Sequence, residues 1–161
     1  MKSHRVDRQQ KNGDGFTLIE LLTAIVIVAI LLALAVPSFK SYQANQEVRS
    51  VAADLLSALN FARSEAVKRA ANITVSPVAT NWADGWAVKT GAALELRKYA
   101  AVSGVTITSS AGSPTYSKDG RLSGAAGISF TVTPVGTTSV SSRCVKVAPS
   151  GKPMNRVGGC S

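Results

Sequence analysis

The first residue that could do chemistry is a carboxylate at the edge of a long apolar run. Glu20 lies five residues after Gly15, and the uncharged stretch Leu21–Phe39 follows it. An ionisable group in such a stretch is costly to desolvate, so it marks a function that involves a partner. A cut after Gly15 would place the new α-amino group of Phe16 within one helical turn of Glu20, where amine and carboxylate could neutralise each other within or between copies. A Glu20 side chain that snorkels to a membrane interface is the simpler alternative.

The second candidate is a pair of thiols, Cys144 and Cys160, which are the only cysteines in the chain. An oxidising compartment would favour their pairing. Closing the loop between them would stabilise the fold by about 3 kcal/mol on the chain-entropy account and tie the C-terminal tail to the strand around Val145–Val147. Two free thiols are the alternative. Since His4 is the only histidine, the ligands for a metal site are too few, and we expect no metal and no cofactor.

The third candidate is a cluster of positive charge. The chain has 18 Lys and Arg against 9 Asp and Glu, a net charge of +9, which favours nucleic acid or an anionic membrane surface as a partner. Arg143, Lys146, Lys152 and Arg156 lie near the C-terminus, and no acidic residue follows Asp119. These side chains could contact phosphates, with an affinity that depends on salt and not on sequence. A solvated basic tail is the alternative.

Enzymatic patterns are missing from the sequence. The serines have no base to activate them, and one histidine cannot support a catalytic triad. Gly151-Lys152 is followed by proline and lacks the glycine that a phosphate-binding loop needs. With 161 residues, 45% of them hydrophobic, the chain is long enough for one folded domain and an anchoring segment. We expect a protein that is not an enzyme.

The apolar run predicts the element that carries Glu20. The 19 residues Leu21–Phe39 would span about 28 Å as a helix, against roughly 30 Å for the hydrocarbon core of a bilayer. The basic segment before them places the N-terminus in the cytoplasm and the rest of the chain outside. One alternative is the buried helix of a soluble protein. Another is a cleaved secretory signal, although Gly15 precedes the run whereas a signal's small residues follow it.

The helix is predicted to continue beyond the membrane. Apolar residues recur every three or four positions, which is typical of one helical face: Val48, Val51, Ala52, Leu55, Leu59, Ala62 and Ala66. We therefore expect one helix from Phe16 to about Ala71, with a kink at Pro37.

The remaining residues predict short strands separated by Gly, Ser, Thr and Pro turns. The expected strands are Ile73–Val78, Gly85–Thr90, Leu94–Tyr99, Val105–Thr108, Ile128–Thr133 and Cys144–Ala148, with a short one near Thr115–Ser117. An antiparallel sheet packed on the apolar face of the helix follows, because neither can bury its apolar surface alone. The expected fold class is α+β, with Trp82 and Trp86 in the core.

The N-terminal motif resembles a known signal. Gly15-Phe16-Thr17-Leu18-Ile19-Glu20, behind a basic leader and before an apolar run, is similar to the type III signal of type IV pilins and type II secretion pseudopilins, and Pro37 falls where those proteins commonly have a proline. The resemblance implies cleavage between Gly15 and Phe16 by a prepilin peptidase. It also implies N-methylation of Phe16 by the same enzyme and a role for Glu20 in assembly.

The downstream half is similar to the GspH/FimT group of minor pilins and pseudopilins. The resemblance rests on Ala62-Arg63-Ser64-Glu65-Ala66, Arg69, Asp84-Gly85-Trp86 and Leu96-Arg97. It implies a pilin fold whose expected regions are a leader (1–15), a membrane and assembly helix (16–39), an amphipathic continuation (40–71) and a periplasmic β-rich head (72–161).

Three functions are compatible with this resemblance. The first is a minor pilin in the inner membrane, with the head in the periplasm, that joins the tip of a type IV pilus and helps to initiate assembly with other pilins. The second is a minor pseudopilin of a type II secretion system. The third is a DNA receptor, because some relatives bind DNA through a C-terminal Gly-Arg-x-Arg motif. Here that motif reads Gly151-Lys152-Pro153-Met154, and lysine lacks the bidentate geometry of arginine.

Overall fold

The structure, a computed structural model, describes residues 15–124 and 126–160. Among these residues it contains one long α-helix, one short 3-10 helix and eight strands. The chain divides into two units, Met1–Ser38 and Phe39–Ser161, which are treated separately below. The second unit is called the head.

Helix α1 runs from Leu18 to Arg69, within two residues of the expected bounds at each end. It begins there because the Thr17 hydroxyl accepts a hydrogen bond from the backbone N–H of Glu20 at 3.3 Å, as an N-cap does. Its end is a Schellman motif, in which the N–H of Ala71 donates to the carbonyl of Ala66 and Ala70 takes a φ of 50°. The helix is continuous through Pro37, but the side chains of 34–37 lie outside the described part, so the kink stays a prediction.

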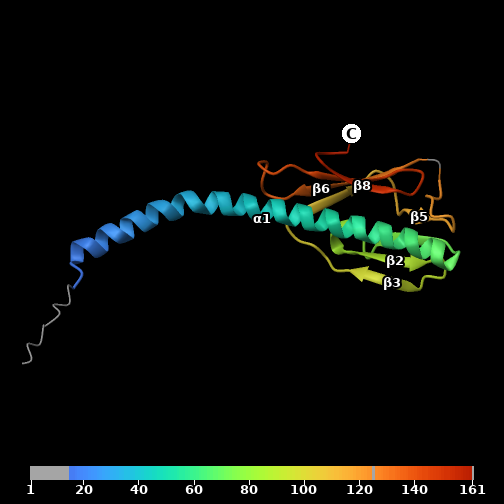
Figure 1. The fold of residues 1–161 in the computed structure, drawn as a ribbon, viewed down its shortest axis with the longest axis horizontal. Coiled ribbons are helices and arrows are strands. Elements are labelled where there is room, and N and C mark those ends of the chain that lie inside the picture. The colour runs from blue at the N-terminus through green and yellow to red at the C-terminus, as the bar shows by residue number, and fades with distance from the viewer. Residues whose placement is uncertain (1–14, 125, 161) are drawn as a thin grey trace, which may run out of the picture. The chain divides into compact units, whose positions relative to one another are not determined.

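The head contains two antiparallel four-stranded sheets (Figure 1). The first has the strand order β3-β2-β1-β5 and the second β4-β6-β7-β8. The bounds are β1 Ile73–Pro77, β2 Trp86–Thr90, β3 Glu95–Tyr99, β4 Val105–Ser109, β5 Thr115–Tyr116, β6 Ile128–Pro134, β7 Arg143–Val147 and β8 Pro153–Val157. The 3-10 helix η1, Trp82–Asp84, precedes β2.

Two features of the head differ from the sequence-based expectation. We expected one sheet and found two, because alternation along a strand indicates which face is buried but not which strand is its neighbour. Strand β8 was not expected at all. It begins at Pro153, pairs only with β7 at the sheet edge, and only its first residue is buried, so it lacks the alternating pattern that marks half-buried strands.

The core of the head lies where α1 packs on both sheets (Figure 1). All seven positions of the expected apolar helix face are buried, as predicted. The two tryptophans are buried too: Trp82 meets the ring of Phe130 edge-on at 4.7 Å, and Trp86 stacks on Tyr99 at 5.3 Å. The predicted α+β class is confirmed.

Candidate functional site

The N-terminal motif forms an exposed coil that leads into a capped helix. Residues 15–17 are not helical, Phe16 is 84% exposed, and no described residue beyond the chain neighbours of Gly15 comes within 4 Å of the place where a Cβ on Gly15 would be. The peptide bond between Gly15 and Phe16 is therefore sterically open.

Glu20 has a local role that the sequence analysis did not assign. Thr17 and Glu20 are the first and fourth residues of a Thr-x-x-Glu sequence, the signature of a capping box. One half of that box is present, since the Glu20 N–H donates to the Thr17 hydroxyl. A carboxylate in the first helical turn also interacts favourably with the helix dipole. A charge at this position is thus compatible with the helix terminus even before any partner binds.

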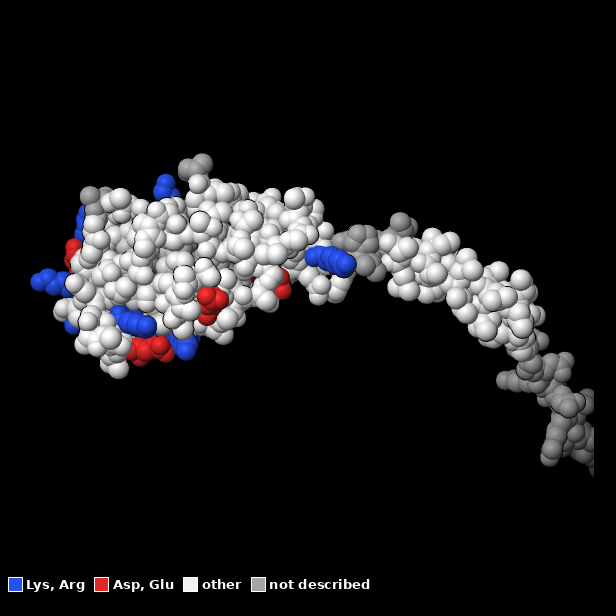
Figure 2. Space-filling view, turned by 180° about the vertical axis from the view of Figure 1, so that it is seen from behind, with Lys and Arg blue, Asp and Glu red and all other residues white. Residues whose placement is uncertain are grey.

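In the described part of the chain, the apolar side chains of the first unit are exposed. Its large side chains, among them Leu22, Ile25 and Leu31, are at least half exposed, and α1 is long and apolar enough to cross a membrane. On the face seen in Figure 2, the described part of this stretch carries no charged side chain. So large an apolar surface requires lipid or other apolar helices around it.

The four basic residues near the C-terminus do not form one group. In the β7–β8 pair, Cys144 lies opposite Arg156 and Lys146 lies opposite Met154. Because residues opposite each other share a face and alternate residues point the same way, Lys146 and Arg156 lie on one face. Lys152 directly precedes β8, and its carbonyl accepts from the Ala148 N–H at 3.1 Å, so it continues the same alternation. Arg143 belongs to the other face.

Elsewhere on the head, charges of both signs are dispersed. The face in Figure 2 shows scattered Lys, Arg, Asp and Glu side chains without a continuous basic surface.

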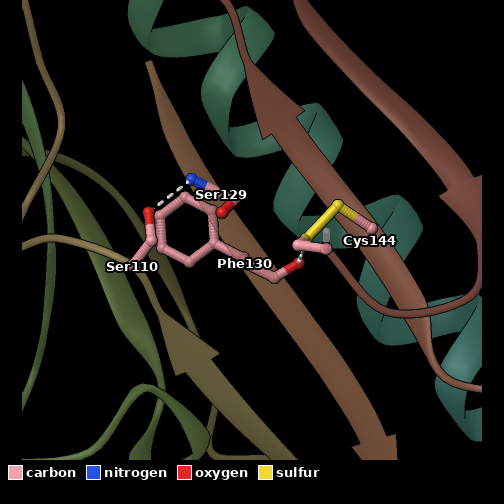
Figure 3. The surroundings of a disulfide bond; sticks show 5 residues. Ser110, Ser129, Phe130 and Cys144 are labelled. Atoms are coloured by element: carbon pink, nitrogen blue, oxygen red, sulfur yellow. Dashed lines mark hydrogen bonds between the residues drawn. A yellow bond between two sulfur atoms is a disulfide. The ribbon is translucent and has the colours of Figure 1, made fainter. Parts of the chain in front are cut away.

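The expected disulfide is present. Cys144 and Cys160 are bonded, with their Cα atoms 5.0 Å apart. The bridge lies beside Phe130 of β6, whose carbonyl oxygen is 3.3 Å from the Cys160 sulfur (Figure 3). A bonded sulfur has no hydrogen to donate, so this is a packing contact. The bond fastens the chain beyond β8 to the centre of the second sheet, as predicted for the tail.

Three charged residues on the second half of α1 have structural partners. Glu65 is buried, and its carboxylate accepts from the Arg69 guanidinium at 2.5 Å and lies 3.6 Å from the Lys68 ammonium. The hydrogen bond from Arg69 lowers the pKa of Glu65 below its ordinary value of 4.5. Arg63 donates to the Gly120 carbonyl at 3.0 Å, which ties the helix to the turn after β5. The Arg63 contact therefore joins α1 to the rest of the head, whereas the ion pairs of Glu65 lie within the last turns of the helix.

Metal-ligating residues are not grouped in the described part of the chain. There, no three His, Cys, Asp or Glu side chains lie close enough together to hold an ion. Arg49 was not expected at a site, yet it lines the same cleft as Arg143. No sequence signal predicts that they share a cleft, because the two arginines are far apart along the chain.

Comparison with known proteins agrees with this geometry. Residues 51–151 match the family described as type II transport protein GspH, and residues 10–36 match the prokaryotic N-terminal methylation motif.

Solved structures with the same fold include the minor pilin FimU of Pseudomonas aeruginosa, with a TM-score of 0.61 and 23% identity over 67% of this chain and 91% of that one. The minor pseudopilin EpsH of Vibrio cholerae matches with a TM-score of 0.53 and 10% identity, over 70% of this chain and 97% of that one. At such identities the likeness shows the fold, whereas the family match extends over more than half of the chain. With its methylation motif and pilin-like fold, the chain belongs to the GspH family of pilins and pseudopilins.

Proposed function

We propose that this protein is a minor pilin that is cut between Gly15 and Phe16, methylated on Phe16 and incorporated into a type IV pilus, where it lies at or near the tip and helps to start assembly. The observation that carries the proposal is the joint match to the methylation motif and the GspH family. Members of this family are structural subunits.

The geometry of the N-terminus supports the proposed processing. The bond to be cut lies in an exposed coil just before the capped start of α1. After the cut, the Phe16 amine would lie about one turn from the Glu20 carboxylate, and both would enter an apolar environment when α1 packs with other helices. An ion pair between copies would then remove the cost of burying each charge alone.

The uncovered apolar surface supports a membrane-anchored precursor. In the proposed precursor, residues 21–39 cross the inner membrane once, the N-terminus is cytoplasmic and the head is periplasmic. The Cys144–Cys160 bridge fits that compartment, since disulfides persist where thiols are oxidised. The partners are a prepilin peptidase and methyltransferase, and other pilins of the filament.

The intact mass of the protein purified from membranes of its own host tests this proposal. We expect a chain that begins at Phe16 and carries one added methyl group. A Gly15→Ala variant tests the cleavage site without changing Phe16 or Glu20, because its added methyl group lies next to the bond to be cut. We expect this variant to accumulate as the uncut precursor. A wild-type chain that still begins at Met1, in a host with an active peptidase, would contradict the proposal.

A minor pseudopilin of a type II secretion system is the second candidate, and the match to the GspH family favours it. The architecture would be the same and only the machine would differ. Deleting the gene separates the two: loss of surface pili with normal protein export supports the pilin, and loss of export with normal pili supports the pseudopilin.

A DNA receptor is the third candidate, and the shared face of Lys146, Lys152 and Arg156 favours it. Neutralising Lys152 and Arg156 would abolish a DNA affinity that falls steeply with salt, if this face binds phosphates. Equal affinity of the wild-type and neutralised proteins would rule this face out.

A further inference from the structure

A polar cleft opens in the head beside the turns of α1 that follow the apolar run. Its volume is about 430 Å³. One wall is formed by α1 and the other by the segment that leads into β7 and by the end of β8. The lining includes Tyr42, Asn45 and Arg49 on the first wall, and Ser139, Arg143 and Val157 on the second.

Two guanidinium groups give this cleft a positive charge. Arg49 and Arg143 both line it, and no Asp or Glu does. Within the described residues, neither arginine makes an ion pair or a hydrogen bond. Hydroxyl groups add neutral hydrogen-bonding capacity, with the Ser41 and Ser139 oxygens 3.1 Å apart. Two arginines and several hydroxyls suit an anion with several oxygens, and the planar guanidinium binds phosphate oxygens in pairs.

The position of the cleft along α1 points to the source of that anion. Phe39 is the last residue of the uncharged run, and Lys40 is the first charge after it. At 1.5 Å per residue, Ser41 lies about 3 Å and Arg49 about 15 Å beyond Phe39 along the helix. The headgroup layer on each side of a bilayer is roughly 5–7 Å thick.

Side-chain direction brings the arginine of this wall closer to that layer. Side chains on a helix lean toward its N-terminus, and therefore the long Arg49 side chain leans toward the apolar end of α1. Tyr42 is exposed on the same turns, and tyrosine is enriched at the level of lipid headgroups. If α1 lies close to the membrane normal, Ser41 and Tyr42 lie at the level of the headgroup layer, and the Arg49 backbone lies about 8 Å beyond it, a distance that a long side chain can largely bridge.

We propose that this cleft binds the phosphate headgroup of an anionic phospholipid in the leaflet that faces the head, and so holds the head against the membrane before assembly. The inference rests on the proposed membrane-anchored function. An acidic side chain of a neighbouring subunit has a suitable charge as well, but the location of the cleft at the end of the membrane-spanning run favours lipid.

The test compares lipid selectivity among full-length proteins in mild detergent. Each protein is mixed with equal amounts of phosphatidylglycerol and phosphatidylcholine, and native mass spectrometry counts the lipids that remain bound. The variant R49Q/R143Q removes the two charges of the cleft. The control K118Q/R121Q removes the same charge from the exposed turn 118–121, whose residues do not line the cleft.

We expect the wild-type protein and the control to prefer phosphatidylglycerol, and R49Q/R143Q to bind it about 30-fold more weakly, since each basic side chain near an anionic lipid surface contributes about a factor of five. An intact Cys144–Cys160 bridge and unchanged tryptophan fluorescence would show that the variant is folded. No preference in the wild-type protein, or an equal loss in the control, would overturn the proposal.

Two further outcomes also decide it. If R49Q/R143Q keeps the lipid preference but no longer enters filaments, the cleft binds an acidic side chain of a neighbour, and the lipid proposal is wrong. Alkaline washing of membranes distinguishes failure of the lipid-binding proposal from failure of the proposed membrane anchoring. A chain released by the wash contradicts the membrane-anchored function itself, whereas a retained chain without lipid preference contradicts only the role of the cleft.

Discussion

At the scale of single residues, the ion pairs of Glu65 connect the chemistry of α1 to the stability of the head. Glu65 is 7% exposed and its carboxylate accepts a hydrogen bond from Arg69, and this bond lowers the pKa of Glu65 below 4.5. A carboxyl whose pKa is lower in the folded state stabilises the protein above its unfolded-state pKa, and this contribution is lost as the pH falls through the folded-state value.

We therefore expect Glu65→Gln to destabilise the head at neutral pH, and the difference from wild type to shrink as the pH falls below about 4.5. Denaturant unfolding of the full chain in micelles would measure it, because the only two tryptophans, Trp82 and Trp86, are both buried in the head. Glu95→Gln, at an exposed carboxylate of β3, makes the same charge change as a control. A difference that stays constant from pH 7 to pH 3 would contradict the assigned role of the ion pair.

Residue types alone predicted the disulfide and the burial of the tryptophans, but not which side chains from distant parts of the chain contact each other. The disulfide followed from the cysteine count and the compartment, and burial of both tryptophans followed from their size. The contact of Arg97 with the ring of Phe61, with its guanidinium carbon 5.0 Å from the ring centroid, could not be predicted, because it joins a strand to a helix across the fold. The cleft that Arg49 and Arg143 both line escaped prediction for the same reason.

At the scale of elements, the end of α1 holds backbone strain that a substitution can relieve. Ala70 occupies the left-handed position of the Schellman motif with a φ of 50°, where glycine is usual because it has no Cβ. Ala70→Gly should stabilise the head by about 1 kcal/mol. Denaturant unfolding would show it, with Ala53→Gly in the exposed helix interior as a control that should destabilise by a similar amount. A loss of stability at position 70 would contradict the assigned motif.

In the turn between β7 and β8, by contrast, replacing a glycine by alanine is expected to destabilise the head. Gly151 has a φ of 82°, and a Cβ there would overlap the carbonyl oxygen of Gly120. Gly151→Ala should therefore destabilise the head by roughly 2 kcal/mol or more. Gly159→Ala is the matched control, since nothing lies within 4 Å of its Cβ position, and it should be within about 0.5 kcal/mol of wild type. Equal stabilities of the two variants would show that the turn can relax.

The disulfide should stabilise the same part of the second sheet. The double variant C144S/C160S removes the bridge without leaving a free thiol, and we expect it to be less stable by about 3 kcal/mol on the chain-entropy account. Limited proteolysis should then cut first between Val157 and Cys160, because β8 is an edge strand held by β7 alone. Cleavage elsewhere in the head would contradict this account of the tail.

Local sequence patterns predicted the helix and the seven earlier strands, whose bounds are within two residues of those expected. Burial alone does not explain this success, since β3 has no buried residue and was still expected. Edge strand β8 lacks such a pattern, because only its first residue is buried and its outer edge pairs with no other strand in the described part of the chain. The division into two sheets depends on long-range pairing, which sequence periodicity does not encode.

At the scale of the whole molecule, the proposed function needs Glu20 for assembly, although the same residue also lies in the first turn of α1, where its backbone N–H donates to the capping hydroxyl of Thr17. The two roles can be separated by substitution. Glutamine can replace glutamate in a capping box but carries no charge, whereas Thr17→Ala removes the cap and keeps the charge. Comparing E20Q, E20A and T17A in the native host therefore tests loss of the charge alone, loss of the charge together with the capping-box side chain, and loss of the Thr17 cap alone.

We expect all three variants to be cut before Phe16, because the bond lies in the coil that precedes the helix. E20Q and E20A should both enter filaments roughly tenfold less than wild type, which corresponds to about 1.4 kcal/mol of lost contact energy, while T17A should enter nearly as well as wild type. The ratio of the chain in sheared filaments to that in membranes measures this. Normal incorporation of E20Q together with a defect in T17A would assign the motif to helix capping and leave the charge without a role in assembly. A defect confined to the Glu20 variants is what pairing of a buried carboxylate with the amine of Phe16 requires, since a charge left alone among apolar helices would oppose their packing.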